Sequence, residues 1–230
     1  MARQTIILDA RLSTLAALVG HCECYADIGC DHGRLGAYLL TGGYVQRAML
    51  TDISAESLQK ARRLIGALGL SDRVEFLVGD GAEALTAAPE ATVVAGMGGA
   101  LIARILRQGR ARLGESRLVL QPNVADVELR RTLMELGYRI TDERIAPDGR
   151  RNYVIIAAEP GRANYDEREL TVGPVLLKTL PETLMPYAAF RLRVADKALR
   201  GAEAGGDAPQ IEVLRREKAI WEEVWTCLQR

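Results

Sequence analysis

The sequence predicts an α/β protein, with a mostly parallel sheet and crossover helices over residues 1–160 and a helical appendage over residues 161–230. In the first region, short runs rich in β-branched residues alternate with helical stretches, as in βαβ units. A glycine or a polar residue directly follows each of the first five runs. After Pro160 and Gly161, two long segments carry apolar residues at helical spacing.

Five short runs are predicted to form the parallel part of the sheet. They are Cys24–Ile28, Arg47–Thr51, Val74–Val78, Ala91–Ala95 and Arg117–Leu120. Two later runs, Tyr138–Ile145 and Asn152–Ala158, are separated by the turn signal Pro147-Asp148-Gly149. This spacing predicts an antiparallel pair that closes the sheet.

The predicted helices lie before and between these runs. An opening helix over residues 9–19 is indicated by apolar residues three and four positions apart. Later helices are expected over residues 33–40, 57–68 and 124–136. Ser54 is placed to cap the second of these, and Gly137 is placed to end the third.

The appendage is predicted to be a helical hairpin that resembles a coiled coil. Its helices cover residues 182–202 and 210–228, and a segment rich in glycine and alanine joins them. Trp221 and Trp225 are four positions apart and therefore share one face of the second helix. That face serves either dimerisation or packing against the first domain.

Charge and cysteine content limit the classes of function. The chain has 30 Lys+Arg and 30 Asp+Glu, so any affinity for RNA must come from local basic patches. The sequence shows neither a signal-peptide pattern nor a membrane span, and we expect a cytoplasmic protein, most simply a monomer. We expect reduced thiols and no metal, because His21, Cys22 and Cys24 lack the second ligand pair of a zinc site.

Carboxylates at three successive strand ends predict the cofactor. An NAD site needs G-x-G-x-x-G after the first strand, but this chain has Cys30, Asp31 and His32 after Gly29, and Asp31 would repel a pyrophosphate. S-adenosylmethionine suits the residues better. Asp27 can pair with its ammonium and sulfonium, Asp52 can accept both ribose hydroxyls, and Asp80 can bind the adenine amine. The remaining predicted residues of this part are Gly29, Ile53, Gly79 and Gly81.

Simpler explanations exist for single members of this set. Asp52 followed by Ser54 is also helix-start chemistry, and Asp80 followed by Gly81 is also a turn. Three such features at three strand ends are better explained by a ligand, because ligands bind at that edge of an open α/β sheet.

Three motifs together resemble a known family. They are Asp27-Ile28-Gly29-Cys30-Asp31-His32, Ala95-Gly96-Met97-Gly98-Gly99 and Leu120-Gln121-Pro122-Asn123. With them the chain resembles, over nearly its whole length, the bacterial tRNA adenine-N1 methyltransferases that modify adenine 22. The resemblance implies a Rossmann-like class I methyltransferase sheet, S-adenosylmethionine as the methyl donor, tRNA as the substrate and a coiled-coil-like appendage that helps to hold the tRNA.

The resemblance places Asp31 and His32 near the transfer site. We expect Asp31 to contact the target adenine or to stabilise its positive charge. His32 either orients the base or carries a proton, or it only binds backbone at a helix N-terminus. Asn123 either binds the Watson–Crick edge of the base or caps the helix that is predicted to begin at Val124.

Further residues are assigned to the cofactor and to the tRNA. Gly96, Met97 and Gly98 are expected to let the backbone approach the methionine end of the cofactor, although close packing of helix on strand also needs small residues. The target base must be turned out of the folded tRNA. The expected tRNA contacts are Arg11, Gln121, Pro122, Arg150 and Tyr153. The alternative for the arginines is an ordinary charged surface.

Two other functions remain open. A methyltransferase of a protein or a small molecule would use the same cofactor residues, and the zero net charge favours it slightly. A non-catalytic RNA-binding protein with a relict Rossmann core is disfavoured by the intact Asp27, Asp52 and Asp80. Cofactor binding and transfer of a labelled methyl group to tRNA distinguish the three.

Overall fold

The computed structural model describes residues 6–149 and 151–229. Arg150, one of the predicted tRNA contacts, lies outside the described residues, as do Met1–Thr5 and Arg230. Two compact units make up the chain, Met1–Asn164 and Tyr165–Arg230.

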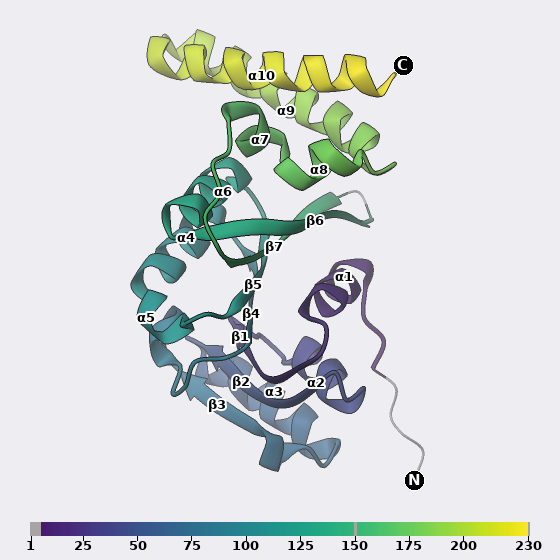
Figure 1. The fold of residues 1–230 in the computed structure, drawn as a ribbon, viewed down its shortest axis with the longest axis vertical. Helices are drawn as coiled ribbons and strands as arrows, with labels where there is room; N and C mark the ends of the chain where they lie inside the picture. Colours follow the sequence, from purple (N-terminus) through teal and green to yellow (C-terminus); the bar gives the residue numbers. More distant parts are fainter. Residues whose placement is uncertain (1–5, 150, 230) are drawn as a thin grey trace. The chain divides into compact units, whose positions relative to one another are not determined.

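Within the described residues, seven strands of the first unit form one sheet in the order β3-β2-β1-β4-β5-β7-β6 (Figure 1). The strands are β1 (Cys22–Ile28), β2 (Val45–Asp52), β3 (Val74–Val78), β4 (Ala91–Met97), β5 (Arg117–Pro122), β6 (Tyr138–Asp148) and β7 (Arg151–Pro160). The first five strands pair in parallel, and β7 is antiparallel to both β5 and β6. The predicted fold, a Rossmann-like sheet closed by an antiparallel pair, is confirmed.

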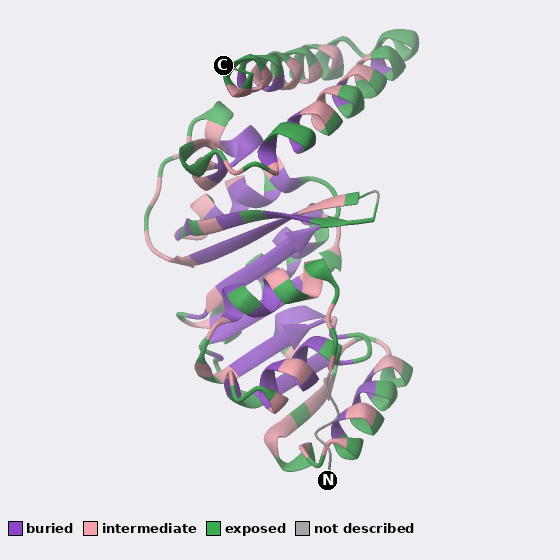
Figure 2. Ribbon diagram, turned by 90° about the vertical axis from the view of Figure 1, so that its right-hand side faces the viewer, coloured by how far each residue is buried: buried purple, intermediate pink, exposed green. Residues whose placement is uncertain are grey.

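Helices cover both faces of this sheet (Figure 1). On one face lie α1 (Ala10–Val19), α2 (Arg34–Thr41) and α3 (Ala55–Ala67), and on the other lie α4 (Gly99–Gln108), α5 (Arg110–Leu113) and α6 (Asp126–Glu135). Short 3-10 turns, η1 (Ser71–Arg73) and η2 (Gly81–Ala84), flank β3. The strands between the two helical layers are largely buried (Figure 2), so they read as near-continuous apolar runs.

Local signals set the ends of several helices. Asp9 caps α1 by accepting a hydrogen bond of 2.7 Å from Leu12 N, and Ser54 caps α3 by accepting one of 3.2 Å from Ser57 N. Gly137, with φ +76°, follows the end of α6 as expected. The helix predicted from Val124 instead begins at Asp126, and Ala125 occupies the N-cap position without a side-chain cap. The interpretation of Asn123 as a helix cap is therefore wrong.

The secondary structure described in the second unit consists of helices. It contains the short helices α7 (Glu167–Val172) and α8 (Pro174–Thr179), which the sequence did not predict, and the long helices α9 (Leu184–Gly205) and α10 (Ala208–Leu228). The long pair forms the predicted hairpin. Trp221 is fully buried and meets the Tyr187 ring edge-on, with centroids 5.7 Å apart, so this tryptophan packs inside the hairpin. None of the described helices is long and apolar enough to cross a membrane.

Candidate active site

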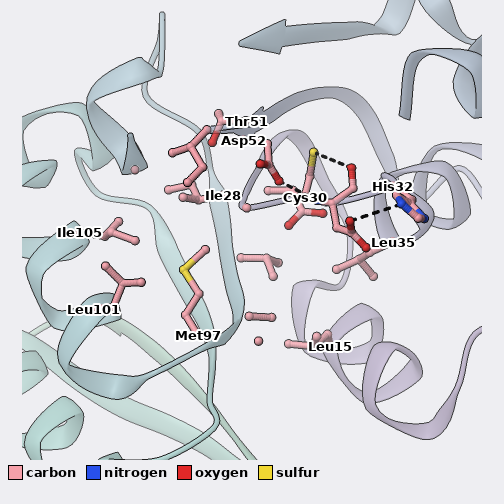
Figure 3. A pocket seen from close by; sticks show the side chains of 18 of the residues that line it. Leu15, Ile28, Cys30, His32, Leu35, Thr51, Asp52, Met97, Leu101 and Ile105 are labelled. Carbon is pink, nitrogen blue, oxygen red and sulfur yellow. Dashed lines mark hydrogen bonds and ion pairs between the residues drawn. The ribbon is translucent and has the colours of Figure 1, made fainter. Parts of the chain in front are cut away.

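A cavity of about 710 Å³ lies at the carboxyl ends of β1, β2 and β4 (Figure 3). This volume is within the usual range for small-molecule sites, roughly 300–1,000 Å³. The predicted residues that line it are Arg11, Asp27, Gly29, Asp31, His32, Asp52, Ile53, Gly79, Asp80, Gly81, Gly96 and Met97. These residues are brought together because parallel strands end at one edge of the sheet.

The loop after β1 is held against the end of β2. Gly29 N and Cys30 N both donate hydrogen bonds of 2.9 Å to Thr51 O, and Asp31 N donates one of 3.1 Å to the Asp52 carboxylate. Gly29 has φ +74°, and a Cβ there would collide with the end of the Met97 side chain. The glycine therefore serves both the turn and the close approach of β1 to β4.

Asp27 is a buried carboxylate at the bottom of the cavity. Its side chain accepts a hydrogen bond of 2.8 Å from the Tyr25 hydroxyl, and the residue is 5% exposed. Burial raises the pKa of Asp27 from its usual 3.8 to about 6, while the Tyr25 hydrogen bond opposes the shift and Asp52 adds to it. A carboxylate with so little water around it favours a cationic partner.

Asp52 presents an oriented carboxylate at the end of β2. One oxygen accepts a hydrogen bond of 2.8 Å from Ser54 N, and the other accepts the bond from Asp31 N. Both oxygens keep lone pairs for further donors. Such an arrangement suits two neighbouring hydroxyl groups.

A second wall of the cavity comes from α4, a part of the site that was not predicted from the sequence. Leu101 and Ile105, four positions apart, give this wall an apolar surface (Figure 3). Arg104 lies between them in sequence and approaches the Asp80 carboxylate to 3.4 Å. The signal for this wall was available, because the helix follows the Gly-Met-Gly-Gly motif directly and carries apolar residues at i, i+4 spacing.

Two further residues that line the cavity, Thr51 and Cys30, are both buried. Thr51 lines the cavity, is fully buried, and its hydroxyl has no hydrogen-bond partner among the described residues. Burial raises the pKa of the Cys30 thiol, so this cysteine stays protonated and is a poor nucleophile. Neither residue was predicted as part of the site.

Asp31 and His32 lie at the mouth of the cavity. His32 Nε2 is 3.5 Å from Asp31 Oδ1, with the two side chains 49% and 74% exposed. Asp31 has φ +49°, a left-handed conformation that a non-glycine residue seldom adopts. Both side chains are free to meet a substrate that approaches from solvent.

Gln121 and Asn123 form a hydrogen-bond network with the end of β4. Gln121 Oε1 accepts from Arg11 Nη1 at 3.0 Å and from Gly96 N at 3.1 Å. Gln121 Nε2 donates to Asn123 Oδ1 at 3.1 Å, and Asn123 Nδ2 donates to Gly96 O at 2.7 Å. The Arg11 guanidinium also lies 5.7 Å from the centre of the Tyr153 ring. The amide of the exposed Asn123 is thus oriented by groups from α1, β4 and β5.

Comparison with known proteins assigns the chain to a family. The family model of TrmK, tRNA (adenine(22)-N(1))-methyltransferase, matches residues 25–210. The chain belongs to this family. The tRNA (adenine(22)-N(1))-methyltransferase of Bacillus subtilis is 36% identical over 179 residues, which cover 74% of this chain and 75% of that protein.

Solved structures of similar proteins share the fold over almost the whole chain. The crystal structure of the Bacillus subtilis m1A22 tRNA methyltransferase has a TM-score of 0.86 at 27% identity and covers 96% of this chain and 99% of that one. The Streptococcus pneumoniae protein Sp1610, in complex with S-adenosyl-L-methionine, has a TM-score of 0.86 at 26% identity and covers 95% of this chain and 100% of that one.

Within this TrmK-family fold, Gly98, Gln121 and Pro122 lie outside the cavity wall, whereas Arg11 lines the cavity. Gly98 is the N-cap residue of α4, and Pro122 is buried at the end of β5. Gln121 is fully buried, so it acts on the site by orienting Asn123 through a hydrogen bond. The Arg11 guanidinium donates a hydrogen bond to Gln121 and lies near the Tyr153 ring, so both groups already interact with this charge. No group of three or more His, Cys, Asp or Glu residues that could hold a metal ion occurs in the described ranges 6–149 and 151–229.

Proposed function

We propose that this chain transfers a methyl group from S-adenosylmethionine to N1 of adenine 22 in tRNA. The observation that carries the proposal is the juxtaposition of three carboxylates, Asp27, Asp52 and Asp80, with the oriented amide of Asn123 at one edge of the sheet. Membership of the TrmK family supports the same reaction.

The donor set of the cavity fits S-adenosylmethionine. Asp27 would hold the ammonium group, because its buried carboxylate lacks a cationic partner at hydrogen-bond distance among the described residues. Asp52 would hold the ribose hydroxyls, with Ile53, Leu101 and Ile105 as apolar surface for the purine. Asp80 would accept a hydrogen bond from the adenine amine. The backbone would approach the cofactor closely at six further residues: Gly29, Gly79, Gly81, Gly96, Met97 and Gly98.

The residues of this chain act mainly by positioning. When bound, the cofactor supplies an electrophilic methyl group on a sulfonium. Adenine N1 already carries a lone pair, so no strong base is needed and the orientation of the base is the main requirement. Asn123 would accept a hydrogen bond from the exocyclic amine through Oδ1 and so present N1. Asp31 would stabilise the positive charge that the base acquires, with His32 beside it.

The remaining assignments concern the tRNA and the organisation of the chain. Residues 1–160 form the catalytic domain, and residues 161–230 form an appendage that helps to hold the tRNA. The protein acts as a cytoplasmic monomer. Tyr153 offers a ring beside Arg11 on which RNA can stack, and Arg150 offers a phosphate contact.

The test is transfer of a labelled methyl group from S-adenosylmethionine to unmodified tRNA, followed by nucleoside analysis. The expected product is labelled N1-methyladenosine that disappears when guanine replaces adenine at position 22. Binding of S-adenosylhomocysteine without methylation of tRNA would move the search to protein or small-molecule acceptors. Absence of cofactor binding would refute the methyltransferase assignment.

A further inference from the structure

Val124 has an apolar side chain that is exposed to solvent beside the candidate active site. It is 68% exposed and directly follows Asn123, whose amide the network orients. A Cβ placed on Gly98 would lie 3.9 Å from Val124 Cγ2, so the valine stands over the start of α4. The preceding residues Gly96 and Met97 line the cavity. Val124 is therefore next to the cavity without belonging to the core.

The backbone around Val124 is held by two main-chain hydrogen bonds. Gly99 N donates to Val124 O at 2.8 Å, and Asn123 N donates to Met97 O at 2.7 Å. A side chain at Gly99 would collide with the carbonyl groups of this loop. The loop after β5 is thus fastened to the loop after β4, and the direction of the valine is set by the chain itself.

Strain in the next residue shows that this conformation is imposed. Ala125 has φ +60° and ψ +44°, the left-handed region that is unfavourable for an L-residue. Such strain persists where the surrounding structure requires it, and it is common at functional sites. In the described part of the chain, Asp31 and Leu180 are the other non-glycine residues with positive φ, and Asp31 lies at the mouth of the same cavity.

The side chain of Val124 has no part in the core, although its backbone carbonyl holds the loop. Its side chain is too exposed to stabilise the core, and the N-cap position of α6 belongs to Ala125. A strained loop that keeps an apolar group in water is unfavourable for the free protein. A partner that covers the valine would recover hydrophobic free energy.

We propose that Val124 contacts the ring face of the target adenine while Asn123 contacts its edge. This inference rests on the proposed function. A base turned out of a folded RNA loses its stacking partners, and an apolar side chain replaces part of that contact. A contact on the face and a hydrogen bond on the edge constrain the base in two directions, which positions N1. Val124 is thus a positioning and specificity residue for the substrate and makes no contact with the cofactor.

The test compares Val124→Ala and Val124→Phe with the wild-type protein. Initial rates of methyl transfer to unmodified tRNA give kcat/KM, and calorimetric titration gives the Kd of S-adenosylhomocysteine. We expect Val124→Ala to lower kcat/KM by about five- to tenfold, because two buried methyl groups are lost from the contact. Val124→Phe is expected to retain the activity, since an aromatic ring also stacks on a base. The Kd and the Tm stay unchanged in both variants because the side chain is exposed.

Val78→Ala is the matched control, since Val78 is 61% exposed at the end of β3 and does not line the cavity. It is expected to leave kcat/KM unchanged. Wild-type kcat/KM for Val124→Ala, or a Kd for S-adenosylhomocysteine that rises as much as kcat/KM falls, would overturn the inference. A wild-type protein that binds the cofactor but does not methylate tRNA would instead contradict the proposed function, and the two failures are thereby distinguished.

Discussion

Arg11 and Gln121 lie 110 positions apart in the chain, yet Arg11 Nη1 donates a hydrogen bond of 3.0 Å to Gln121 Oε1. The same oxygen accepts from Gly96 N, so two donors define which end of the amide faces α1. The other end of Gln121 then has to donate to Asn123. Gln121 is in this way a positioning residue, although it is fully buried.

Replacing Gln121 with leucine is expected to lower kcat for methyl transfer by about tenfold or more, because a misplaced substrate reacts much more slowly. The Kd of S-adenosylhomocysteine should change by less than about twofold, since no cofactor contact is assigned to Gln121. Steady-state rates with tRNA and calorimetric titration measure the two quantities. A large loss of cofactor affinity with an unchanged kcat would contradict the positioning role. The conservative variant Gln121→Glu, which keeps the acceptor oxygen but replaces the Nε2 donor to Asn123 with a second acceptor, should also be impaired.

Cofactor affinity is expected to fall at acidic pH. The pKa of Asp27 is raised to about 6, mainly by burial, with Tyr25, Asp52 and Arg11 as the other groups that act on it. Below that pH the carboxyl group is neutral, and binding of an ammonium group must displace its proton. The Kd of S-adenosylhomocysteine should therefore rise by up to about tenfold per pH unit below pH ~6. Titrations from pH 7.5 to about pH 5 measure this dependence.

The control for this prediction is Asp27→Asn, which should bind the cofactor weakly with little pH dependence over the same range. The raised pKa of Asp27 affects folding stability in the opposite direction. Because the folded pKa of about 6 exceeds the usual 3.8, the stabilisation from protonated Asp27 is complete below about pH 4 and is lost as the pH rises through 6. A pH-independent Kd for the wild-type protein would show that Asp27 does not hold the ammonium group.

Replacing Thr51 with valine is expected to stabilise the protein without its cofactor. The Thr51 hydroxyl is buried without a partner among the described residues, and valine has the same shape without the polar group. The free energy of unfolding should rise by about 1 kcal/mol, at the lower end of the cost of an unsatisfied buried group. Urea denaturation measures the change. Thr51→Ser keeps the hydroxyl but removes a buried methyl group, so it should destabilise the protein. A less stable Thr51→Val would show that the hydroxyl is hydrogen-bonded in solution.

The ion pair between Arg130 and Glu143 is expected to stabilise the fold without affecting the affinity for the cofactor. Arg130 Nε lies 2.7 Å from Glu143 Oε1, and both side chains are completely buried; Asp126 approaches the same guanidinium to 3.2 Å. Glu143→Leu should lower the free energy of unfolding by about 3–5 kcal/mol, because the buried Arg130 guanidinium loses a charged partner. Adding Arg130→Met should recover part of this loss. A double-mutant cycle from urea denaturation measures the coupling, and purely additive losses would contradict it.

The sequence was sufficient for the parts of the structure that depend on local patterns. The strand runs, the Ser54 cap and the glycine after α6 are each encoded within a few residues, and the carboxylates at strand ends meet because parallel strands share an edge. Three successive strand ends with Asp27, Asp52 and Asp80 therefore predicted a single cavity.

The features that escaped prediction depend on contacts between distant segments. The role of Arg11 as a partner of Gln121 requires α1 to pack beside the end of β5, which no local pattern specifies. Asn123 resembles a helix cap in sequence, but the left-handed Ala125 delays the helix by two residues. The burial of Thr51 likewise appears only once the sheet is assembled.

The position of β7 in the sheet has a consequence for synthesis on the ribosome. It is the last strand in the chain, but it lies between β5 and β6, and it therefore covers the edge of β5 only after residue 160 has been made. Until then β5 exposes unpaired backbone groups, which invite pairing with other chains. At translation rates of about 5–20 residues per second this interval lasts a few seconds. A chain stalled between β5 and β7 therefore keeps an open strand edge that can pair with other chains.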